Sequence, residues 1–440
     1  MKKFRGIIYL FVLVALLLFL AFKFYQNITN YIPESIKNNV PDSIVTLHLK
    51  ITDFINVSKT PDNFLYNVKF LPETNFGEFD LKLFSLTQDE SNNSSDLIFN
   101  EGTASEKFFI DVFKDNIVVS TFDGNIFYFL KNRLELNKGD IRLSKIRSNL
   151  KEYPQLKILD SFIDDNNIFI STFKLDEQSL KKKLYCNFSI FQANLNFEVL
   201  SFERIFFNPG CTEGVIQGGR IQKISLDQSS GLLFSLAANV SDHPTTEPQD
   251  DNSNFGKIIF LNLNTLNTEI FSKGHRNPGG LYVKDDLILS TEHGPQGGDE
   301  INKIIRNKNY GWPIVSYGSY YFAKEKKYLK NHDLNDFEEP LYSYIPSIGI
   351  NEIVKIPEQF IQYDLQNTFF VSSLHGRSLH LVQFDKNYNR VIFSERIFLN
   401  RIVRDIKYID EYNSFILSLG RKGNGEPSQL GVLIPKSNNE

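Results

Sequence analysis

Short strand-forming runs fill nearly the whole chain and limit it to an all-β fold. Runs such as NIVVSTF, NIFISTF, GKIIFLNL and FILSLG are rich in β-branched and aromatic residues, and turn sequences such as DGN, DDNN and KGNG separate them. Beyond residue 25, no segment shows the 3.6-residue apolar period of a long amphipathic helix. Many short strands at even spacing predict a barrel, a sandwich or a propeller.

Repeated phrases favour a β-propeller among these folds. The segment 108–129 reads as strand, turn, strand, Asp-Gly turn and strand, which corresponds to three strands of one blade. The segments 279–294 and 405–423 repeat this plan with divergent residues. From about residue 102 to 435 the chain supplies about six blades of roughly 55 residues each. We therefore predict a six-bladed β-propeller, with a large β-sandwich as the alternative.

The N-terminus combines a basic start with an apolar run. Lys2, Lys3 and Arg5 precede residues 6–22, whose length is near the lower limit of about 17 residues for a membrane-spanning helix. The run ends in AFKF, a poor cleavage site. We expect an uncleaved signal-anchor, with a cleaved secretory signal as the alternative. The basic residues should stay inside, so we expect a single-pass protein of the inner (cytoplasmic) membrane whose globular part faces the periplasm.

Changes in composition divide the chain into four parts. We assign residues 1–25 to the signal-anchor helix, 26–45 to a polar stalk, 46–100 to a β-rich N-terminal extension and 101–437 to the propeller. The role of the extension stays open between two alternatives. It supplies a strand that closes the ring and protects sheet edges, or it forms a small appended subdomain.

Charge and cysteine content restrict the function further. The 48 basic and 52 acidic residues give a net charge of −4, which does not suggest a nucleic-acid-binding surface. The two cysteines, Cys186 and Cys211, do not make a metal site at their spacing. Outside the cytosol they are able to form a disulfide, and two unpaired thiols are the alternative.

The segment from Phe271 to Tyr321 does not read as a set of core strands. It is rich in glycine, contains the only tryptophan of the chain, Trp312, and places charged residues between short apolar runs. Exposed loops that arrange backbone carbonyls, carboxylates and an Arg-Asn pair around a ligand have this composition. The segment is therefore the first candidate for a functional site.

The order of phrases in this segment resembles the soluble PQQ-dependent aldose dehydrogenases, the glucose/sorbosone dehydrogenase family. The phrases are GHRNP, EHGP, GGDEIN, KNYGWP and a tyrosine-rich tail. The resemblance implies a propeller that binds pyrroloquinoline quinone (PQQ) and calcium and that takes a sugar or alcohol as its substrate.

The resemblance implies calcium near the loop that begins at Gly294. In the family, the carbonyls of the Gly-Pro pair that matches Gly294 and Pro295 hold the calcium that contacts the cofactor. The residues that match Glu300 and Tyr310 hold a structural calcium. Calcium prefers oxygen ligands, including backbone carbonyls that glycine and proline turns direct inward. A glycine-rich hairpin whose acidic side chains only face water is the alternative.

The resemblance also implies cofactor-binding residues. PQQ is a planar quinone with three carboxylates, and a fixed guanidinium suits both its carboxylates and its reactive carbonyls. The Arg-Asn pair that contacts the cofactor in the family matches Arg276 and Asn277, and Tyr321 matches a tyrosine near it. Gln155 matches the glutamine of a Q-G-G-L-L-D phrase that has lost both glycines here, and Arg404 matches an arginine of an R-x-R-D phrase. Ordinary surface or strand-end polar residues are the alternative.

One position departs from the family. There, a histidine four residues before the arginine of a G-G-R-[LI] phrase is the general base that takes the proton of the sugar hydroxyl. Here Gly218, Gly219 and Arg220 are intact, but Ile216 stands at that position. An isoleucine side chain cannot accept a proton. Glu213 is the candidate substitute base, although no spacing supports it.

Three functions follow from these observations. The first is a membrane-anchored extracytoplasmic propeller whose dehydrogenase chemistry is altered or lost and that still binds calcium, a quinone, a sugar or a protein partner. The second is an active PQQ- and calcium-dependent sugar or alcohol dehydrogenase with a relocated base. The third is a protein-interaction propeller without a ligand pocket. Because Ile216 replaces the general base, we favour the first.

Overall fold

The computed structural model describes most of the chain from residue 68 onward. The chain divides into two compact units, residues 1–62 and 63–440, and all described residues lie in the second. The predicted signal-anchor and stalk lie outside the described residues, within which no helix has the length and apolar character needed to span a membrane. The described ranges are 68–70, 78–88, 107–135, 139–176, 184–213, 218–238, 246–320, 327–361, 366–420 and 427–436, without the side chains of residues 68–70 and 213.

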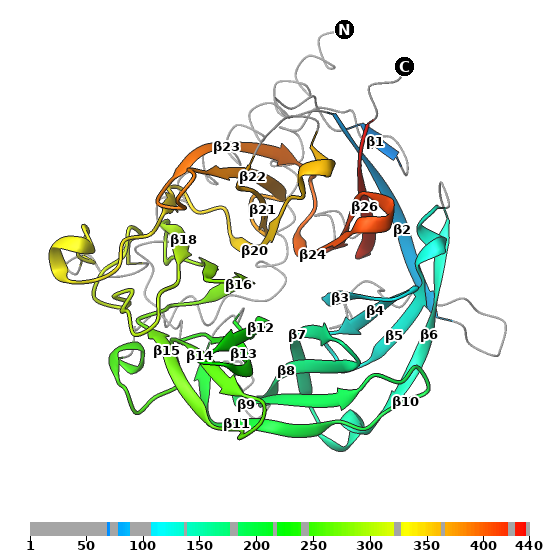
Figure 1. Cartoon of the computed structure of the whole chain (residues 1–440), viewed down its shortest axis with the longest axis horizontal. Helices are drawn as coiled ribbons and strands as arrows, with labels where there is room; N and C mark the ends of the chain where they lie inside the picture. Colours follow the sequence, from blue (N-terminus) through cyan, green and yellow to red (C-terminus); the bar gives the residue numbers. More distant parts are fainter. Residues whose placement is uncertain are drawn as a thin grey trace, which may run out of the picture. The chain divides into compact units, whose positions relative to one another are not determined.

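The strands form six groups of four, which we call blades 1 to 6 (Figure 1). In pairing order, blade 1 contains β3 (Phe108–Phe113), β4 (Asn116–Thr121), β5 (Ile126–Leu130) and β6 (Asp140–Ser148); blade 2 contains β7 (Leu156–Asp164), β8 (Asn167–Asp176), β9 (Leu184–Asn194) and β11 (Glu203–Glu213); and blade 3 contains β12 (Ile221–Leu226), β13 (Ser229–Leu236), β14 (Lys257–Asn262) and β15 (Thr268–Lys273).

The remaining blades follow the same order along the chain. Blade 4 contains β16 (Pro278–Lys284), β17 (Leu287–Glu292), β18 (Asp299–Lys303) and β19 (Tyr342–Tyr344); blade 5 contains β20 (Ile350–Lys355), β21 (Thr368–Ser373), β22 (Ser378–Phe384) and β23 (Val391–Phe398); and blade 6 contains β24 (Val403–Ile409), β25 (Ser414–Leu419), β26 (Gln429–Pro435) and β2 (Phe79–Gln88). Two short strands, β1 (Val68–Phe70) and β10 (Val199–Leu200), pair with β2 and β6. In the described part of the chain, helix is limited to the 3-10 turns Lys131–Glu135, Asn149–Glu152, Glu247–Gln249, Asp333–Asn335, Glu358–Phe360 and Asp410–Tyr412.

The burial of each strand follows its place in a blade. The middle strands β21 and β25 are buried at every position, because side chains of other strands cover both faces. Their sequences are therefore nearly continuous apolar runs. The outermost strand β6 alternates between buried and exposed residues over most of its length, since one of its faces is open to water.

Aromatic side chains fill much of the space between neighbouring blades. Between blades 5 and 6, Phe360 packs edge-on against Phe415 with their ring centroids 4.7 Å apart. Between blades 2 and 3, Phe188 and Phe234 are stacked with centroids 5.7 Å apart. Such pairs add about 0.5–1.5 kcal/mol beyond the burial of their area, so the core lies between the blades rather than in one central cluster.

The first strands of the six blades contact one another in succession. β3 contacts β7, β7 contacts β12, β12 contacts β16, β16 contacts β20, β20 contacts β24, and β24 contacts β3 again (Figure 1). These six strands therefore line a closed ring. The arrangement is propeller-like and differs from the two facing sheets of a sandwich, so the all-β, propeller-like part of the prediction is confirmed.

Hydrogen bonds that involve side chains cross every boundary between neighbouring blades near this ring. Buried polar groups need such partners, because leaving one unpaired costs about 1–3 kcal/mol. The bonds are Ser161 Oγ to Asp111 Oδ2 (2.6 Å), Ile221 N to Asp160 Oδ2 (2.9 Å), Arg220 Nε to Gly279 O (2.8 Å), Thr291 Oγ1 to Asn351 O, Asn351 Nδ2 to Arg404 O (2.6 Å) and Ile110 N to Asp405 Oδ2 (2.7 Å).

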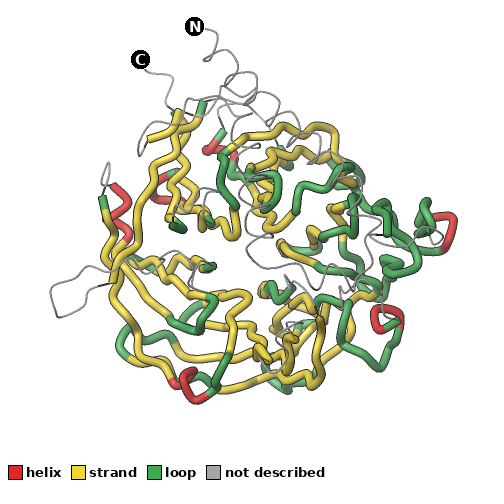
Figure 2. Tube along the Cα trace, turned by 180° about the vertical axis from the view of Figure 1, so that it is seen from behind, coloured by secondary structure: helices red, strands yellow, loops and turns green. Residues whose placement is uncertain are grey.

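The strand β2 joins the two ends of the ring. It pairs antiparallel with β26 as the fourth strand of blade 6, and its last residues, from Ser85, pair parallel with β6 of blade 1. Of the two alternatives for residues 46–100, the structure supports the closing strand for Phe79–Gln88. Pairing on both sides satisfies strand edges that would otherwise be open. Figure 2 shows the same strands from behind, connected mainly by loops.

The two cysteines form a disulfide in the structure. Cys186 on β9 and Cys211 on β11 are direct partners in the antiparallel register. Of the two alternatives left open by the sequence, pairing is therefore the one observed. The bond fastens the two outer strands of blade 2, next to the end of β11 at Glu213.

Candidate functional site

Most of the predicted site residues lie at one end of the ring. Strands within a blade are antiparallel, so the connections between blades and the loops between second and third strands leave from the same end. Arg276 and Asn277 lie in the connection into β16, and Gly294 and Pro295 lie in the loop after β17. Gln155 lies in the connection into β7. We call this end of the ring the connecting face.

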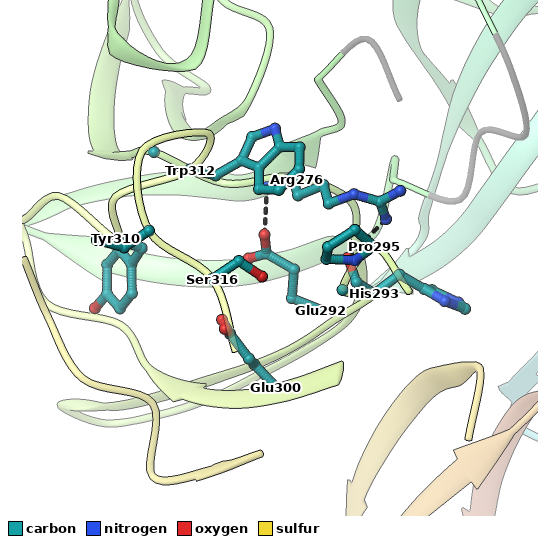
Figure 3. Close-up of a pocket in the computed structure, with 11 residues that line it drawn as sticks. Arg276, Glu292, His293, Pro295, Glu300, Tyr310, Trp312 and Ser316 are labelled. Atoms are coloured by element: carbon teal, nitrogen blue, oxygen red, sulfur yellow. Dashed lines mark hydrogen bonds between the residues drawn. The ribbon is translucent and has the colours of Figure 1, made fainter. Parts of the chain in front are cut away.

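One pocket on the connecting face brings together the phrases GHRNP, EHGP, GGDEIN and KNYGWP (Figure 3). All four predicted calcium ligands and Arg276 line it. Its volume is about 10 Å³, which is about the space that one water molecule or small ion needs. A tricyclic quinone would have to lie outside it, against its rim. The lining residues are Gly274, Arg276, Glu292, His293, Gly294, Pro295, Glu300, Tyr310, Trp312, Val315 and Ser316.

Glu292 fixes the backbone at Arg276. Its buried carboxylate accepts a hydrogen bond from the backbone N–H of Arg276 (Figure 3). Its Oε2 also lies 3.0 Å from His275 Nδ1. His275 Nε2 in turn lies 2.8 Å from Ser272 Oγ, so this histidine is fully engaged within the fold. Glu292 is not among the site residues predicted from the sequence. Its position as the first residue of the phrase EHGP was the signal that could have identified it.

The guanidinium of Arg276 is held at the wall of the pocket. Its Nη1 donates to the carbonyl of His293 at 2.9 Å, and its central carbon lies 5.3 Å from the centroid of the Trp312 ring. A cation over an indole ring is attracted by the electron density of the ring face. An arginine held in this way has a defined direction and keeps its charge, which suits a carboxylate ligand.

Asn277 connects the Arg276 segment to the phrase G-G-R. Its Oδ1 accepts a hydrogen bond from Gly218 N at 3.2 Å, and its carbonyl accepts one from His293 N at 3.1 Å. Gly219 has a φ of +107°, and an added Cβ would lie 2.8 Å from Leu159 Cβ. Only glycine adopts this backbone at such close range without strain, so packing against blade 2 explains the glycine at position 219.

Asp299 holds the loop that contains the predicted Gly-Pro ligands. Its Oδ1 accepts from Gly294 N at 3.0 Å, and its Oδ2 accepts from Ile348 N at 2.9 Å and Ile350 N at 3.0 Å. The side chain is fully buried. A buried carboxylate with three backbone donors is well satisfied, so Asp299 acts as a brace for Gly294 and Pro295.

Glu300 is the predicted metal ligand whose environment best suits a cation. Burial, together with the nearby charge of Glu292, raises its pKa to about 8. A cation in the pocket would favour its ionised form. By contrast, the Tyr310 hydroxyl donates to Lys303 O and accepts from Ile305 N at 3.0 Å, so the phenol is already engaged. Among the described residues there is no group of three or more His, Cys, Asp or Glu side chains placed to hold a metal, so carbonyl oxygens would have to complete a site.

The remaining predicted site residues do not line this pocket. Gln155 is exposed and lines a second pocket, described below. Arg404 lies near the start of β24, where its carbonyl accepts from Arg220 and Asn351. Ile216 and Tyr321 lie outside the described residues, and Glu213 ends β11 without a described side chain.

Arg220 lies in a buried cluster of charges at the ring of inner strands. Its Nη1 is 2.8 Å from Asp160 Oδ1, 3.0 Å from Glu352 Oε2 and 3.4 Å from Asp405 Oδ1. Burial disfavours the charge of Arg220, but Glu352, Asp160 and Asp405 together raise its pKa above the usual value. Burial raises the pKa of the Glu352 carboxyl to about 7 even though Arg220 opposes this shift. The sequence identified Arg220 only as part of a phrase, because its partners are distant in the chain.

Comparison of the chain with known proteins gives matches to one protein family. The family profile described as "Glucose / Sorbosone dehydrogenase" matches residues 156–425. The aldose sugar dehydrogenase YliI of Escherichia coli is 26% identical over 229 residues, which cover 48% of this chain and 59% of that protein. The chain spans about half the length of the first two curated relatives it matches (45% and 59%).

Solved structures show the same fold. The soluble aldose sugar dehydrogenase of Escherichia coli in its apo form aligns with a TM-score of 0.59 at 17% identity, over 81% of this chain and 100% of that one. The PQQ-bound aldose sugar dehydrogenase of Streptomyces coelicolor aligns with a TM-score of 0.54 at 16% identity, over 83% and 100%. Because the family profile covers more than half of the sequence, the chain belongs to the glucose/sorbosone dehydrogenase family.

Proposed function

We propose that this protein binds PQQ and calcium on the connecting face and recognises a sugar or alcohol there, with its oxidation chemistry altered or lost. The observation that supports this proposal best is the fixed Arg276 at a pocket that also contains Glu300 and the Gly294–Pro295 loop. Two of the hydrogen bonds that fix Arg276 go to residues of the phrase EHGP, Glu292 and His293, so the cation and the oxygen-rich loop are held in one unit.

The residues present fit an anionic cofactor at the rim of the pocket. Arg276 would bind a carboxylate or quinone oxygen, because its guanidinium is buried against Trp312 and charged. Asn277 holds the adjoining backbone through Gly218. PQQ, when bound, supplies a two-electron acceptor for the oxidation of a hydroxyl group. The protein positions the ligands and excludes water from Arg276.

Calcium would occupy the small pocket beside the Gly294–Pro295 loop. The Glu300 carboxylate would supply one ligand there, and backbone carbonyls would supply the others. Because Glu292 and Asp299 add negative charge near Glu300, a divalent cation would relieve their mutual repulsion. Asp299 would keep the loop in place without binding the ion itself, since its oxygens already accept three backbone donors.

Proton removal is the step that we propose to be altered. Ile216 offers no lone pair for the hydroxyl proton, and Glu213 stands three residues before it in the sequence. Without a base, hydride transfer from a neutral alcohol is strongly disfavoured, and a typical general base contributes about 10²–10⁴-fold in rate. We therefore expect bound PQQ to remain oxidised in the presence of an aldose.

The test is a titration of the full-length protein with PQQ, with and without calcium, followed by absorbance and then by addition of glucose. We expect calcium-dependent binding without bleaching. Arg276→Gln should weaken binding at least tenfold, whereas Arg306→Gln should not, because Arg306 pairs with Glu269 and Asp227 on the surface. Bleaching by glucose would show an active dehydrogenase with a substitute base. No binding of PQQ would overturn the proposal and leave an interaction propeller.

We also propose the inner membrane as its location, with residues 1–25 as the anchor and the propeller outside. The support is the basic start before an apolar run. Protease added to spheroplasts should digest the propeller while an intact cytoplasmic marker survives. Protection of the propeller from protease, or its release as a soluble protein, would contradict this arrangement.

A further inference from the structure

A second and larger pocket opens beside blade 1, away from the pocket at Arg276. Its volume is about 430 Å³, within the range of about 300–1,000 Å³ that is usual for small-molecule sites. The turn between β4 and β5, the end of β6 and the connection into β7 form its walls. All three segments leave their blades at the connecting face, so the pocket opens on the same side as the proposed cofactor site.

Positive charge dominates the wall of this pocket. Lys145, Arg147, Lys151 and Lys157 line it, and among the described residues Asp123 is the one acidic residue in the lining. Asp123 is already paired with Lys157 at 2.7 Å. Within the described part of the chain, Lys145, Arg147 and Lys151 form no ion pair, although the protein as a whole carries a net charge of −4. Three cations that have no acidic partner among the described residues surround one cavity and create a local positive potential that attracts an anion.

Polar and aromatic side chains complete the pocket. Asn125, Ser148 and Gln155 add hydrogen-bonding groups. The half-buried ring of Tyr153 is fixed edge-on against Phe191, with centroids 4.9 Å apart, and adds an aromatic surface. Hydroxyl-rich ligands need such donors and acceptors, and an aromatic ring contacts the apolar face of a sugar ring. The combination fits a sugar that also carries a negative charge.

We propose that this pocket binds the anionic group of an acidic sugar, a uronic acid or a sugar phosphate. Arg147 offers a bidentate partner to a carboxylate or phosphate, and Lys145 and Lys151 add charge around it. Gln155 links the pocket to the start of β7, an inner strand of the ring. As a substrate subsite the pocket rests on the proposed function above, whereas the binding of the anion does not.

The experiment measures binding by calorimetry on the full-length protein in the absence of PQQ. The probes are glucuronate, glucose 6-phosphate, glucose and inorganic phosphate. We expect one of the two acidic sugars to bind at least tenfold more tightly than glucose and than phosphate. Its affinity should fall as salt rises from 0.05 to 0.5 M, since salt screens exposed charges. The stronger of the two acidic sugars identifies the carboxylate or the phosphate as the group that is recognised.

Substitutions in the wall assign the binding to this pocket. Arg147→Gln and the double change Lys145→Gln, Lys151→Gln should each weaken binding at least tenfold, and Lys386→Gln, on an exposed turn elsewhere, should not. The changed side chains are exposed, so thermal melting should stay within a few degrees of the wild type. Equal affinity for glucose, equal affinity for inorganic phosphate, or wild-type affinity in the Arg147→Gln protein would each overturn the proposal.

Binding of acidic sugars and binding of PQQ are measured independently, so failure of this proposal is distinguishable from failure of the proposed function. Acidic sugar binding without any PQQ binding would support the pocket and contradict the quinone proposal. PQQ binding with no acidic sugar binding would contradict the pocket alone.

Discussion

Arg220 Nη2 donates a hydrogen bond to the carbonyl oxygen of Arg404 at 2.6 Å. Arg220 immediately precedes β12 of blade 3, and Arg404 is the second residue of β24 of blade 6, so one guanidinium connects blades that are not neighbours in the ring. The same side chain donates to Gly279 O, two residues beyond Asn277. The backbone of the proposed cofactor site and that of Arg404 therefore share one buried cation.

Replacing Arg220 should strongly destabilise the protein. Arg220→Met removes the guanidinium that contacts Asp160, Glu352 and Asp405 and leaves them only the more distant charge of Lys407, 3.8 Å from Asp405. Breaking a buried ion pair in this way typically costs about 3–5 kcal/mol. Unfolding in urea measures the change. Lys223→Met on the adjoining strand removes a partly exposed pair with Asp164 and should cost no more than about 1 kcal/mol. Equal effects of the two substitutions would contradict the role of Arg220.

The contribution of Asp111 to stability should fall as the pH rises from about 4 to about 8. Burial raises the pKa of Asp111 to about 8, so the folded state keeps a proton that the unfolded chain has already lost in this range. Asp111→Asn mimics the protonated form and should reduce the loss by about 1 kcal/mol or more. Urea unfolding at several pH values measures both proteins. Parallel stability curves for the two proteins would show that Asp111 does not titrate in this way.

Calcium should raise the melting temperature, and chelation with EDTA should reverse the shift. An ion that binds only the folded state at a concentration of about 100 times its Kd stabilises it by about 2.7 kcal/mol. Glu300→Gln should abolish most of the calcium-dependent shift while the apo protein remains folded. Glu338→Gln changes a surface partner of Lys308 and should leave the shift intact. A calcium shift that survives Glu300→Gln would place the ion elsewhere.

Reduction of the disulfide should weaken blade 2. Cys186 and Cys211 are 25 residues apart, and a loop of that size corresponds to about 3 kcal/mol in the chain-entropy account. Unfolding in urea should shift to lower concentration with a reductant, and the double change Cys186→Ser, Cys211→Ser should reproduce the shift. The reductant should then have no further effect on the double variant, and an additional shift there would argue against the disulfide as its cause.

The closing strand should contribute to the stability of the whole ring. Leu81 on β2 is fully buried among residues of blades 5 and 6, so Leu81→Ala should cost about 2–5 kcal/mol. Lys114→Ala, in the exposed turn between β3 and β4, is the matched control and should cost less than about 0.5 kcal/mol. A negligible effect of Leu81→Ala on unfolding in urea would mean that β2 is dispensable.

The sequence predicted the strands well and the contacts between them poorly. Middle strands such as β25 are buried on both faces, so their apolar runs are visible without knowledge of their partners. β2 has an equally clear strand pattern, but nothing in that pattern specifies β26 as its neighbour. The closing strand was therefore only one of two alternatives.

For the candidate site, too, the sequence indicates the residues but not the contacts between them. Arg276 and Gly294 stand in recognisable phrases, and the structure places both on one pocket. The bonds that hold them are formed by Glu292 and Asp299, whose chemistry alone does not distinguish a brace from a ligand. Arg220 and Asp405 are 185 residues apart, so no local spacing indicates that they meet.

The position of β2 between blades 6 and 1 also determines when the protein is able to finish folding. β2 ends at Gln88, and its partner β26 begins at Gln429. The ribosome therefore makes β2 long before it makes β26. At about 5–20 residues per second, the interval is on the order of tens of seconds. Throughout that time Phe79–Phe84 of the nascent chain lack the strand with which they pair in blade 6, while Ser85–Gln88 are able to pair with β6 much earlier.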